Sequence, residues 1–297
     1  MRAKLRLSLV VVFYNMAREA PRTLFTMSTK YQRKVHSEDY EVIVVDAGSE
    51  PAITSDFING FGSNFRLLRF EAAPSPVAAV NRAVEMTRGD AIALCIDGAR
   101  MLSPGIVRLM LDAFAVWNDP VVATLAWHLG PRNQSVSMLD GYNQEREDEL
   151  LASVDWQADG YELFRIAALA GSSEAGWFHP IAESNCLAVR RESWRKLGGL
   201  HEGFLSSGGG LVNLDFYRQA CDQLETLVIL LGEGSFHQFH GGVTTNTPLK
   251  PGRLKQFFDE YTTVRGRTFE RSNRSAFYFG SMPAQAMPFI QPSAVSG

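Results

Sequence analysis

Cysteine is scarce in this sequence of 297 residues, which contains only Cys95, Cys186 and Cys221 and no CxxC pair. An odd number of widely spaced cysteines among apolar residues is typical of reduced core thiols. The pattern argues against a cysteine zinc site and against a dithiol redox centre. It favours a reducing compartment, and we expect a cytoplasmic protein.

Long hydrophobic runs are also lacking. The apolar run at Val10–Tyr14 is far shorter than the roughly 20 residues that span a bilayer. Charged Arg18 and Glu19 follow it where a secretory signal would place a small-residue cleavage site. We therefore interpret this run as a first strand and expect no transmembrane segment, with peripheral association at a membrane left open.

Neither sign of charge dominates, because 29 Lys and Arg residues face 32 Asp and Glu residues, for a net charge of −3. This balance gives no reason to expect a nucleic-acid partner. Hydrophobic residues at 45% and charged residues at 21% are ordinary for a globular protein. The length suffices for one large α/β domain or two small ones, and the sequence contains no internal repeat.

Strand-like and helix-like segments alternate along the chain, which predicts a mostly parallel sheet flanked by helices. Expected strands are residues 5–14, 40–45, 65–70, 91–97, 121–127, 185–189 and 226–231. Expected helices are residues 17–33, 56–61, 77–87, 103–117, 191–197 and 213–222. Three of the strands end at Asn15, Asp46 and Asp97, and parallel strands bring their carboxyl ends to the one edge where such sheets bind ligands.

The remaining segments carry weaker signals. The acidic run 145–149 is expected to be a solvated helix face without a chemical role. The glycine-rich loop 206–210 has no phosphate-binding spacing, and residues 283–297 are expected to form a loosely held tail. Three tryptophans could stack on sugars or belong to the core, and both interpretations stay open for Trp127, Trp156 and Trp177.

Several motifs occur in an order and spacing that resemble a family 2 glycosyltransferase of the A-type nucleotide-sugar fold. They are Tyr14-Asn15 after the first strand, Val44-Val45-Asp46-Ala47-Gly48-Ser49, Asn81-Arg82, Arg88-Gly89-Asp90, Asp97, and Gly198-Gly199-Leu200-His201-Glu202. The resemblance covers roughly residues 5–245. It implies a single A-type glycosyltransferase domain with a Rossmann-like, mixed and mostly parallel sheet.

The resemblance also implies an organisation and an activity. Residues 1–245 would form the glycosyltransferase domain, with a nucleotide-sugar-binding half at 1–130 and an acceptor-side half at 131–245. Residues 246–297 would form a C-terminal helix and tail that act as a lid, hinged at Gly241-Gly242. The expected activity is inverting transfer of a sugar from a nucleotide sugar, such as a UDP-sugar, to an unknown carbohydrate-type acceptor hydroxyl in glycan or polysaccharide biosynthesis.

By the same resemblance, seven residues are expected to bind the donor. Asp46 would accept a ring N–H of the base, the backbone at Phe13 and Tyr14 would pack against it, and Asp97 would meet ribose or metal. The full set is Phe13, Tyr14, Asn15, Asp46, Asn81, Asp97 and Arg100.

The sequence departs from the family pattern at Ala99, where a second metal-binding aspartate is expected. Arg100 beside it could neutralise the departing diphosphate in place of a cation. His240 matches a late histidine that joins the metal in this fold, and His237, three residues before it, strengthens the ligand interpretation. We expect Asp97 and His240 to hold a divalent cation, Mn or Mg, weakly. Basic residues near the end either form a solvated face or close over the diphosphate, namely Arg253, Lys255, Arg265, Arg267, Arg271 and Arg274.

A second departure concerns the general base, because Asn213 stands where the family has an aspartate and asparagine cannot accept the proton. We rank Asp215 first as a replacement, followed by Glu202 and Glu183. Ala99 and Asn213 together also favour an alternative, a catalytically silent protein of this fold that binds a nucleotide sugar or a carbohydrate. A nucleotidyltransferase is disfavoured, because residues 13–18 lack its glycine-rich basic loop.

Overall fold

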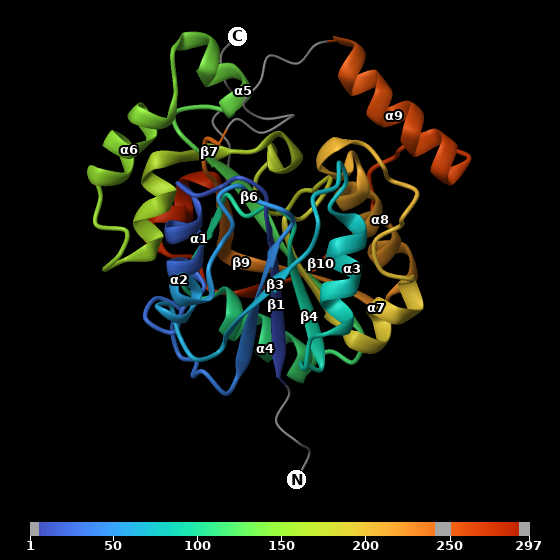
Figure 1. Ribbon diagram of the computed structural model, residues 1–297, viewed down its shortest axis with the longest axis horizontal. Helices are drawn as coiled ribbons and strands as arrows, with labels where there is room; N and C mark the ends of the chain where they lie inside the picture. Colours follow the sequence, from blue (N-terminus) through green and yellow to red (C-terminus); the bar gives the residue numbers. More distant parts are fainter. Residues whose placement is uncertain (1–5, 241–250, 291–297) are drawn as a thin grey trace.

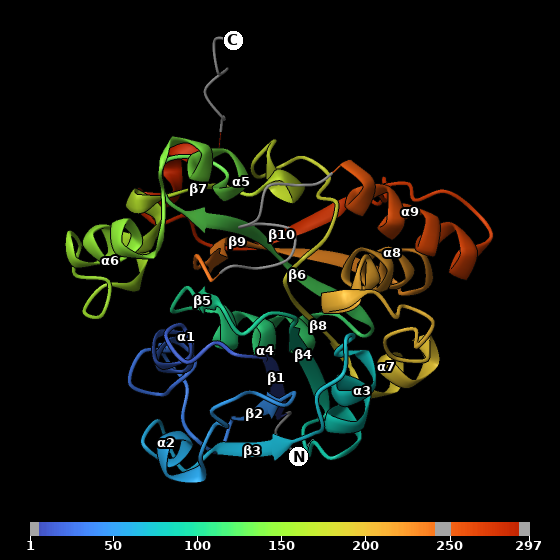
Figure 2. The same ribbon diagram turned by 45° about the horizontal axis from the view of Figure 1, so that its top comes forward.

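The computed structural model describes residues 6–240 and 251–290 (Figure 1). Its sheet consists of β1 (Leu7–Phe13), β2 (Tyr40–Asp46), β3 (Phe65–Arg69), β4 (Ala91–Cys95), β5 (Arg100–Leu102), β6 (Pro120–Leu129), β7 (Ala167–Leu169), β8 (Cys186–Arg190), β9 (Thr226–His237) and β10 (Ala276–Gly280). The main strand order is β10-β9-β6-β8-β4-β1-β2-β3, and β5 and β7 pair with β9 and β6. Figure 2 shows the strands stacked in this order, from β3 near the bottom to β10.

Helices cover both faces of the sheet (Figure 1). The α-helices are α1 (Ala20–Thr26), α2 (Ser55–Asn59), α3 (Val77–Glu85), α4 (Ile106–Val116), α5 (Gln134–Ser137), α6 (Gln144–Ala152), α7 (Arg191–Leu197), α8 (Val212–Gln223) and α9 (Pro251–Arg265). The 3₁₀ turns are η1 (Met138–Asp140), η2 (Gly160–Ile166), η3 (Gly171–Ser173), η4 (Ser207–Gly209) and η5 (Ala284–Phe289). Helices α1, α2 and α4 enclose one apolar core, and α3, α7, α8 and α9 enclose the other.

The central strands are buried over their whole length because helices pack on both of their faces. β1 pairs in parallel with β2 and β4, and the register places Phe13 beside Asp46 and Val11 beside Cys95. The carboxyl ends of three strands therefore meet at one edge. This confirms the predicted α/β class with one mixed, mostly parallel sheet.

The sheet divides partway along β6 and β9. β6 pairs with β8 only through Val122 and Ala123. Beyond that point β9 advances from Ile229 to Gly234 while β6 advances only from Ala123 to Leu125, so β9 contains a bulge. The outer half of β9 then pairs with β6 on one side and β5 on the other, which aligns His237 with His128 and with Arg100.

Several local predictions were wrong. β9 runs six residues past the expected end at 231, and neither β5 nor β10 was expected. The segment from Pro283 is not loose throughout, because Ala286 is buried and the Phe289 ring lies 5.5 Å from that of Trp127. The predicted helix 17–33 is shortened to α1.

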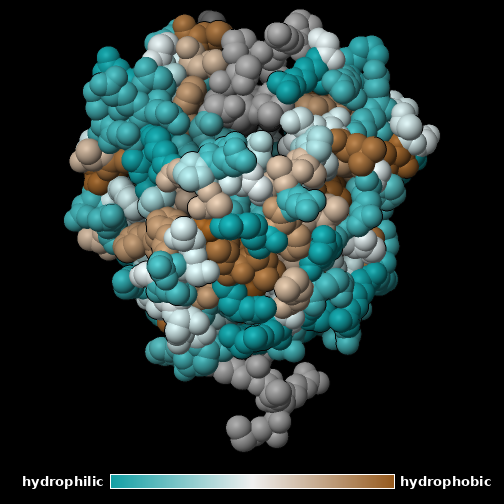
Figure 3. Space-filling model, in the orientation of Figure 1, coloured by the Kyte–Doolittle hydropathy of each residue, from teal (hydrophilic) through white to brown (hydrophobic). Residues whose placement is uncertain are grey.

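Other side chains settle open points. Trp127 and Trp177 are fully buried and Trp156 is 7% exposed, so these rings belong to the core and do not present a sugar-stacking face. All three cysteines are free and buried, as predicted. Within residues 6–240 and 251–290, no helix is long and apolar enough to cross a membrane. The face drawn in Figure 3 is mostly hydrophilic, with apolar residues gathered toward its lower middle.

Candidate active site

Three ligand-type side chains converge where β4 and β9 end. The Oδ2 atom of Asp97 lies 3.0 Å from Nε2 of His237 and 3.6 Å from Nε2 of His240. The two Nε2 atoms are 3.1 Å apart, and one ligand atom of each residue lies within 4.8 Å of the others. The other carboxylate oxygen of Asp97 accepts the backbone N–H of Ala99, which fixes the carboxylate across the turn.

The charges in this cluster depend on each other. Burial alone would raise the pKa of Asp97, but the attraction of His240 and hydrogen bonds with both imidazoles hold it well below its ordinary value. Burial lowers the pKa of His237 to about 4, against the opposing effect of Asp97. Burial would also lower the pKa of His240, but Asp97 raises it overall. Asp97 therefore favours protonation of His240 over protonation of His237.

The donor set fits a divalent cation. Nδ1 of His237 lies 2.7 Å from Oε1 of Gln134, so the single proton of the neutral ring belongs on Nδ1. Its unprotonated Nε2 then faces a carboxylate oxygen at 3.0 Å. Two electron-rich atoms at this distance repel each other unless a positive charge lies between them. Two imidazoles and one carboxylate suit Mn²⁺ or Zn²⁺ better than Mg²⁺.

Arg100 adds a buried positive charge next to this cluster. The residue is 6% exposed, and neither Nε nor Nη1 has a hydrogen-bond partner among the described residues. Its charge contributes to lowering the pKa of His237 and of His128, for which burial is the main cause. A buried guanidinium with unsatisfied N–H groups is a ready donor for an anionic ligand.

Glu183 is the carboxylate that the fold brings to the same edge. β8 starts opposite the end of β4, with Cys186 paired to Cys95, so the residues just before β8 lie close to the turn that carries Asp97. Nδ2 of Asn213, at the start of α8, donates to Oε2 of Glu183 at 2.6 Å and to the carbonyl of Ser184 at 3.2 Å. Asn213 therefore orients a partly exposed acid.

Asp215, ranked first as general base from the sequence, is corrected by the structure. Its carboxylate is buried and accepts two hydrogen bonds from Arg265 of α9, at 2.7 and 2.5 Å. Both oxygens thus face a permanent cation. Arg265 is one of the basic residues that were considered for the diphosphate. It joins α9 to α8 instead.

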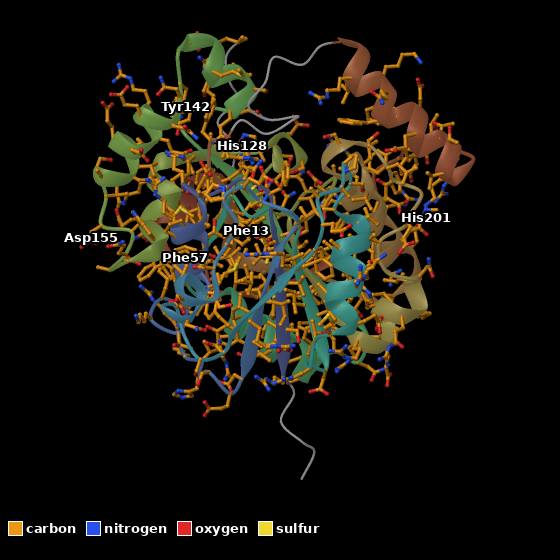
Figure 4. All side chains as sticks on the ribbon, viewed as in Figure 1. Phe13, Phe57, His128, Tyr142, Asp155 and His201 are labelled. Atoms are coloured by element: carbon orange, nitrogen blue, oxygen red, sulfur yellow. The ribbon has the colours of Figure 1, made fainter. Side chains whose placement is uncertain are left out.

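Glu202 and Asn81 lie in a structural connection. The Asn81 side chain donates to the carbonyl of Leu200 at 2.8 Å and accepts the N–H of Leu200 at 3.0 Å. The contact of its amide with Glu202 is longer, at 3.5 Å, and Glu202 is exposed. Figure 4 places the adjacent His201 toward the right edge and His128 near the middle. We therefore assign Asn81 to fastening this loop rather than to the donor.

The residues at the ends of β1 and β2 hold the rim together. Asp46 is fully buried, and its carboxylate accepts the N–H groups of Ser49 at 2.8 Å and Ile53 at 3.1 Å. The Asn15 side chain accepts the N–H of Glu50 at 2.8 Å. Tyr14, 53% exposed, presents its side chain to solvent at this rim, and Asn15 beside it is exposed as well.

Phe13 contributes no side chain to the rim, because its ring is fully buried. A Cβ at Gly98 would lie 2.3 Å from this ring, so the turn after β4 approaches it closely. Figure 4 shows Phe13 near the centre of the molecule, inside the layer of strands and helices. The glycine thus lets the turn between Asp97 and Ala99 lie directly on the core.

A cavity of about 460 Å³ lies beside the ends of β2 and β3. Ala47 and Phe70 line it from the sheet side, and Ala79 and Arg82 line it from α3. The Arg82 guanidinium also lies 5.1 Å from the centre of the Phe70 ring. The cavity thus offers an aromatic ring and a cation next to the strand that ends at Asp46.

The predicted hinge at Gly241-Gly242 lies outside the described residues. Further along the chain, α9 packs through the buried Phe257 and Tyr261. Glu260 of the same helix accepts the backbone N–H groups of Leu205 and Ser206, both at 2.8 Å. α9 is therefore joined to the loop that precedes α8.

Comparison with known proteins identifies the family of the chain. The family described as Glycosyl transferase family 2 matches residues 8–169, more than half of the chain. The chain belongs to this family. A comparison with curated protein sequences gave no match. The family assignment confirms the resemblance drawn from the motifs.

Solved structures share the fold at low identity. S. aureus TarS 1–349 in complex with UDP-GlcNAc has a TM-score of 0.54 at 11% identity, over 88% of this chain and 68% of that chain. GalNAc-T7 with UDP, GalNAc and Mn²⁺ has a TM-score of 0.52 at 14% identity, over 87% and 48%. The mannosyltransferase PcManGT from Pyrobaculum calidifontis, in complex with GDP-Man and Mn²⁺, has a TM-score of 0.50 at 15% identity, over 91% and 67%.

These similarities show a shared A-type glycosyltransferase fold. The chain spans about two thirds of the length of the TarS fragment and of PcManGT, and about half of GalNAc-T7. Their bound nucleotides and cations belong to those proteins.

In the sequence, the spacing of His237 and His240 strengthened the ligand interpretation, but only His240 was assigned to the metal. Gln134 and Glu147, the two residues behind His237, were missed. Glu147 was assigned to a solvated acidic face, and this was wrong. Its side chain is fully buried and accepts the N–H of Phe239 at 2.6 Å and a bond from Arg18 at 3.2 Å. Burial raises the pKa of Glu147 to about 7.

Proposed function

We propose that this family 2 protein is an inverting glycosyltransferase that moves a sugar from a nucleotide sugar, with UDP-sugars as the first candidates, to a carbohydrate-type hydroxyl. The observation that best supports this proposal is the convergence of Asp97, His237 and His240 at the carboxyl edge of the sheet, beside Glu183. The reaction would serve glycan or polysaccharide biosynthesis, and the free cysteines support a cytoplasmic location.

The donor is proposed to lie along the rim from the cavity to the metal cluster. The base would occupy the 460 Å³ cavity, against Phe70 and Arg82. The diphosphate would then extend toward Asp97 and the unsatisfied guanidinium of Arg100. A divalent cation held by Asp97, His237 and His240 would supply neutralisation of the charge that develops on the leaving diphosphate.

Glu183 is proposed as the general base in place of Asp215. The acceptor oxygen attacks the anomeric carbon, the bond from that carbon to the diphosphate oxygen breaks, and the hydroxyl proton passes to the Glu183 carboxylate. Asn213 holds one oxygen of Glu183 at 2.6 Å, which leaves the other for the acceptor. α9 and the loop 204–206 would close the acceptor side, consistent with the proposed lid at 246–297.

The second candidate is a binding protein of the same fold without transferase activity. It is favoured by Asn213 and Ala99, which replace two acids expected by resemblance. The two candidates share the donor site and differ only in turnover. The geometry favours the enzyme, because Glu183 and the cluster of Asp97 with its two histidines both remain at the edge of the sheet.

The deciding experiment incubates the protein with UDP-, GDP- and dTDP-sugars, Mn²⁺ and a panel of oligosaccharide acceptors, and measures nucleotide release and glycosylated product. We expect product with at least one donor, and about 10²- to 10⁴-fold less with Glu183→Gln at unchanged donor affinity. Asp215→Asn is the matched control and should retain the chemistry. Donor binding without turnover in every combination would establish the binding protein instead.

A further inference from the structure

The side chain of Gln134, the first residue of α5, packs directly behind His237. It is fully buried. Its Oε1 faces Nδ1 of His237 at 2.7 Å, and its Nε2 donates to the carbonyls of His237 at 2.9 Å and Leu129 at 3.1 Å. The backbone N–H of Gln134 donates to Nδ1 of His128 at 2.9 Å. Gln134 thus contacts both His128 of β6 and His237 of β9, which are paired in the sheet.

These contacts fix which end of the Gln134 amide is oxygen. A backbone carbonyl only accepts hydrogen bonds, so the atom that faces two carbonyls must be the NH₂ group. Oε1 is then the atom facing His237, and it can only accept. A proton on Nδ1 of His237 would be donated to Oε1, with the Nε2 lone pair directed at Asp97 and His240. The Asp97 carboxylate also only accepts, so Gln134 and Asp97 compete for the ring proton until a cation occupies the Nε2 side.

The buried carboxylate of Glu147 supports the backbone between His237 and His240. Oε2 of Glu147, on α6, accepts the N–H of Phe239 at 2.6 Å, and the Gln134 amide lies 3.4 Å from the same oxygen. Arg18 completes this group from the chain before α1, at 3.2 Å from the other carboxylate oxygen. The backbone between His237 and His240 is therefore held from behind by residues of α5 and α6.

We propose that Gln134 is a positioning residue of this site, which sets the Nδ1-protonated tautomer of His237 and so presents Nε2 as a metal ligand. The inference rests on the proposed function for the role of the metal, but the tautomer itself belongs to the metal-free chain. Groups behind a metal-bound histidine fix the ring and its tautomer in this way. Gln134 touches no reacting atom and acts only through His237.

The experiment compares three variants with the wild-type protein. Gln134→Leu removes both the oxygen that faces Nδ1 of His237 and the NH₂ group that donates to the two carbonyls. Gln134→Glu keeps an oxygen next to Nδ1 but loses the NH₂ group. Gln32→Leu is the control, because Gln32 is also a buried amide that donates to two backbone carbonyls, of Thr26 at 2.8 Å and Ser103 at 3.0 Å, away from the histidines.

The first readout is the ¹⁵N NMR spectrum of the imidazoles in the metal-free protein, which distinguishes a protonated Nδ1 from a protonated Nε2. We expect Nδ1–H for His237 in the wild type, Gln32→Leu and Gln134→Glu, and a shift toward Nε2–H in Gln134→Leu. The second readout is calorimetric binding of Mn²⁺ alone. We expect about 10- to 100-fold weaker binding for Gln134→Leu and at most a small change for Gln134→Glu.

An Nε2–H tautomer in the wild-type protein would overturn the proposal, and this measurement needs no variant to fold. Equal loss of Mn²⁺ affinity in Gln134→Leu and Gln134→Glu would also overturn it, because the amide would then matter only as packing. If the wild type binds no Mn²⁺ or transfers no sugar, the proposed function fails, while the tautomer comparison still decides the role of Gln134.

Discussion

The side-chain amide of Asn213 lies 2.6 Å from a carboxylate oxygen of Glu183. An acid and an amide therefore form a pair at the edge of the sheet, with the acid on the segment before β8 and the amide on α8. Asparagine at the start of α8 removes a carboxylate from the position expected by resemblance, but the fold supplies another one in contact with it. The first prediction tests this pair.

Asn213→Asp should place two carboxylates at hydrogen-bond distance. Like charges this close cannot both ionise easily, so one of the two pKa values rises. Because a protonated Glu183 cannot accept the acceptor proton, the rising limb of the kcat profile should move to higher pH by about one unit or more. A pH profile of transfer measures this. A limb that stays in place would argue that neither carboxylate is the base.

Removal of one imidazole should weaken metal binding. His240 lies within 3.1 Å of His237 and 3.6 Å of Asp97, so His240→Ala deletes one of the three proposed ligands. We expect Mn²⁺ affinity to fall by about 10-fold or more. His201→Ala is the control, since His201 is exposed and lies on the loop after α7. Titration of free Mn²⁺ by electron paramagnetic resonance gives the affinities, and equal values would exclude His240 as a ligand.

Asp215→Ala should destabilise the protein. Loss of one partner of a buried ion pair costs about 3–5 kcal/mol, and since the Arg265 side chain is 25% exposed, we expect about 2–3 kcal/mol here. Denaturation in urea measures the loss. In the double variant with Arg265→Ala, the two losses should be less than additive. Additive losses would show that the pair does not couple α8 to α9 energetically.

Gly105→Ala should strain the connection between α4 and β9. A Cβ at this position would lie 2.2 Å from a carboxylate oxygen of the buried Glu233. Such overpacking costs about 1–3 kcal/mol, and the displaced carboxylate would lose its bond from Ser103. Gly252→Ala is the matched control, because, apart from its own turn of α9, no atom of the described residues lies within 4 Å of its added Cβ. Equal melting temperatures for the two variants would contradict this geometry.

Glu233 should also make stability depend on pH. Burial raises its pKa above the ordinary value of 4.5, although Ser103, Tyr161 and the N–H of Gly105 donate to it. Between the unfolded and folded pKa values the native state binds more protons, so stability falls as pH rises through this window. The free energy of unfolding of the wild type minus that of Glu233→Gln should therefore decrease above pH 4.5. A difference independent of pH would refute the shift.

Much of the architecture follows from local sequence. The apolar strands β1, β2 and β4 and their polar ends at Asn15, Asp46 and Asp97 were predictable, because a strand covered on both faces must be continuously apolar and must end where polar residues return. Family motifs at these ends also identified the fold. The strand pattern and the motifs together therefore located the functional edge of the sheet.

The remainder depends on pairings between distant segments. The spacing of His237 and His240 is visible in the sequence, but the contact of His237 with Asp97 is not, because β9 reaches this edge past a bulge that periodicity does not report. Glu147 was misassigned because a single buried position on a short charged helix has no distinct pattern. Asp215 was ranked first by its sequence position, and only the chain 50 residues later shows its arginine partner.

β9 gives the site a property that its residues alone do not reveal. The same 12-residue strand holds apolar side chains of both cores at one end and His237 at the other. Amide groups in such a strand exchange with solvent only when the whole sheet opens. The two imidazoles therefore could not be grafted onto another protein as a loop alone. The graft would also have to include β5, β6 and the bulge of β9.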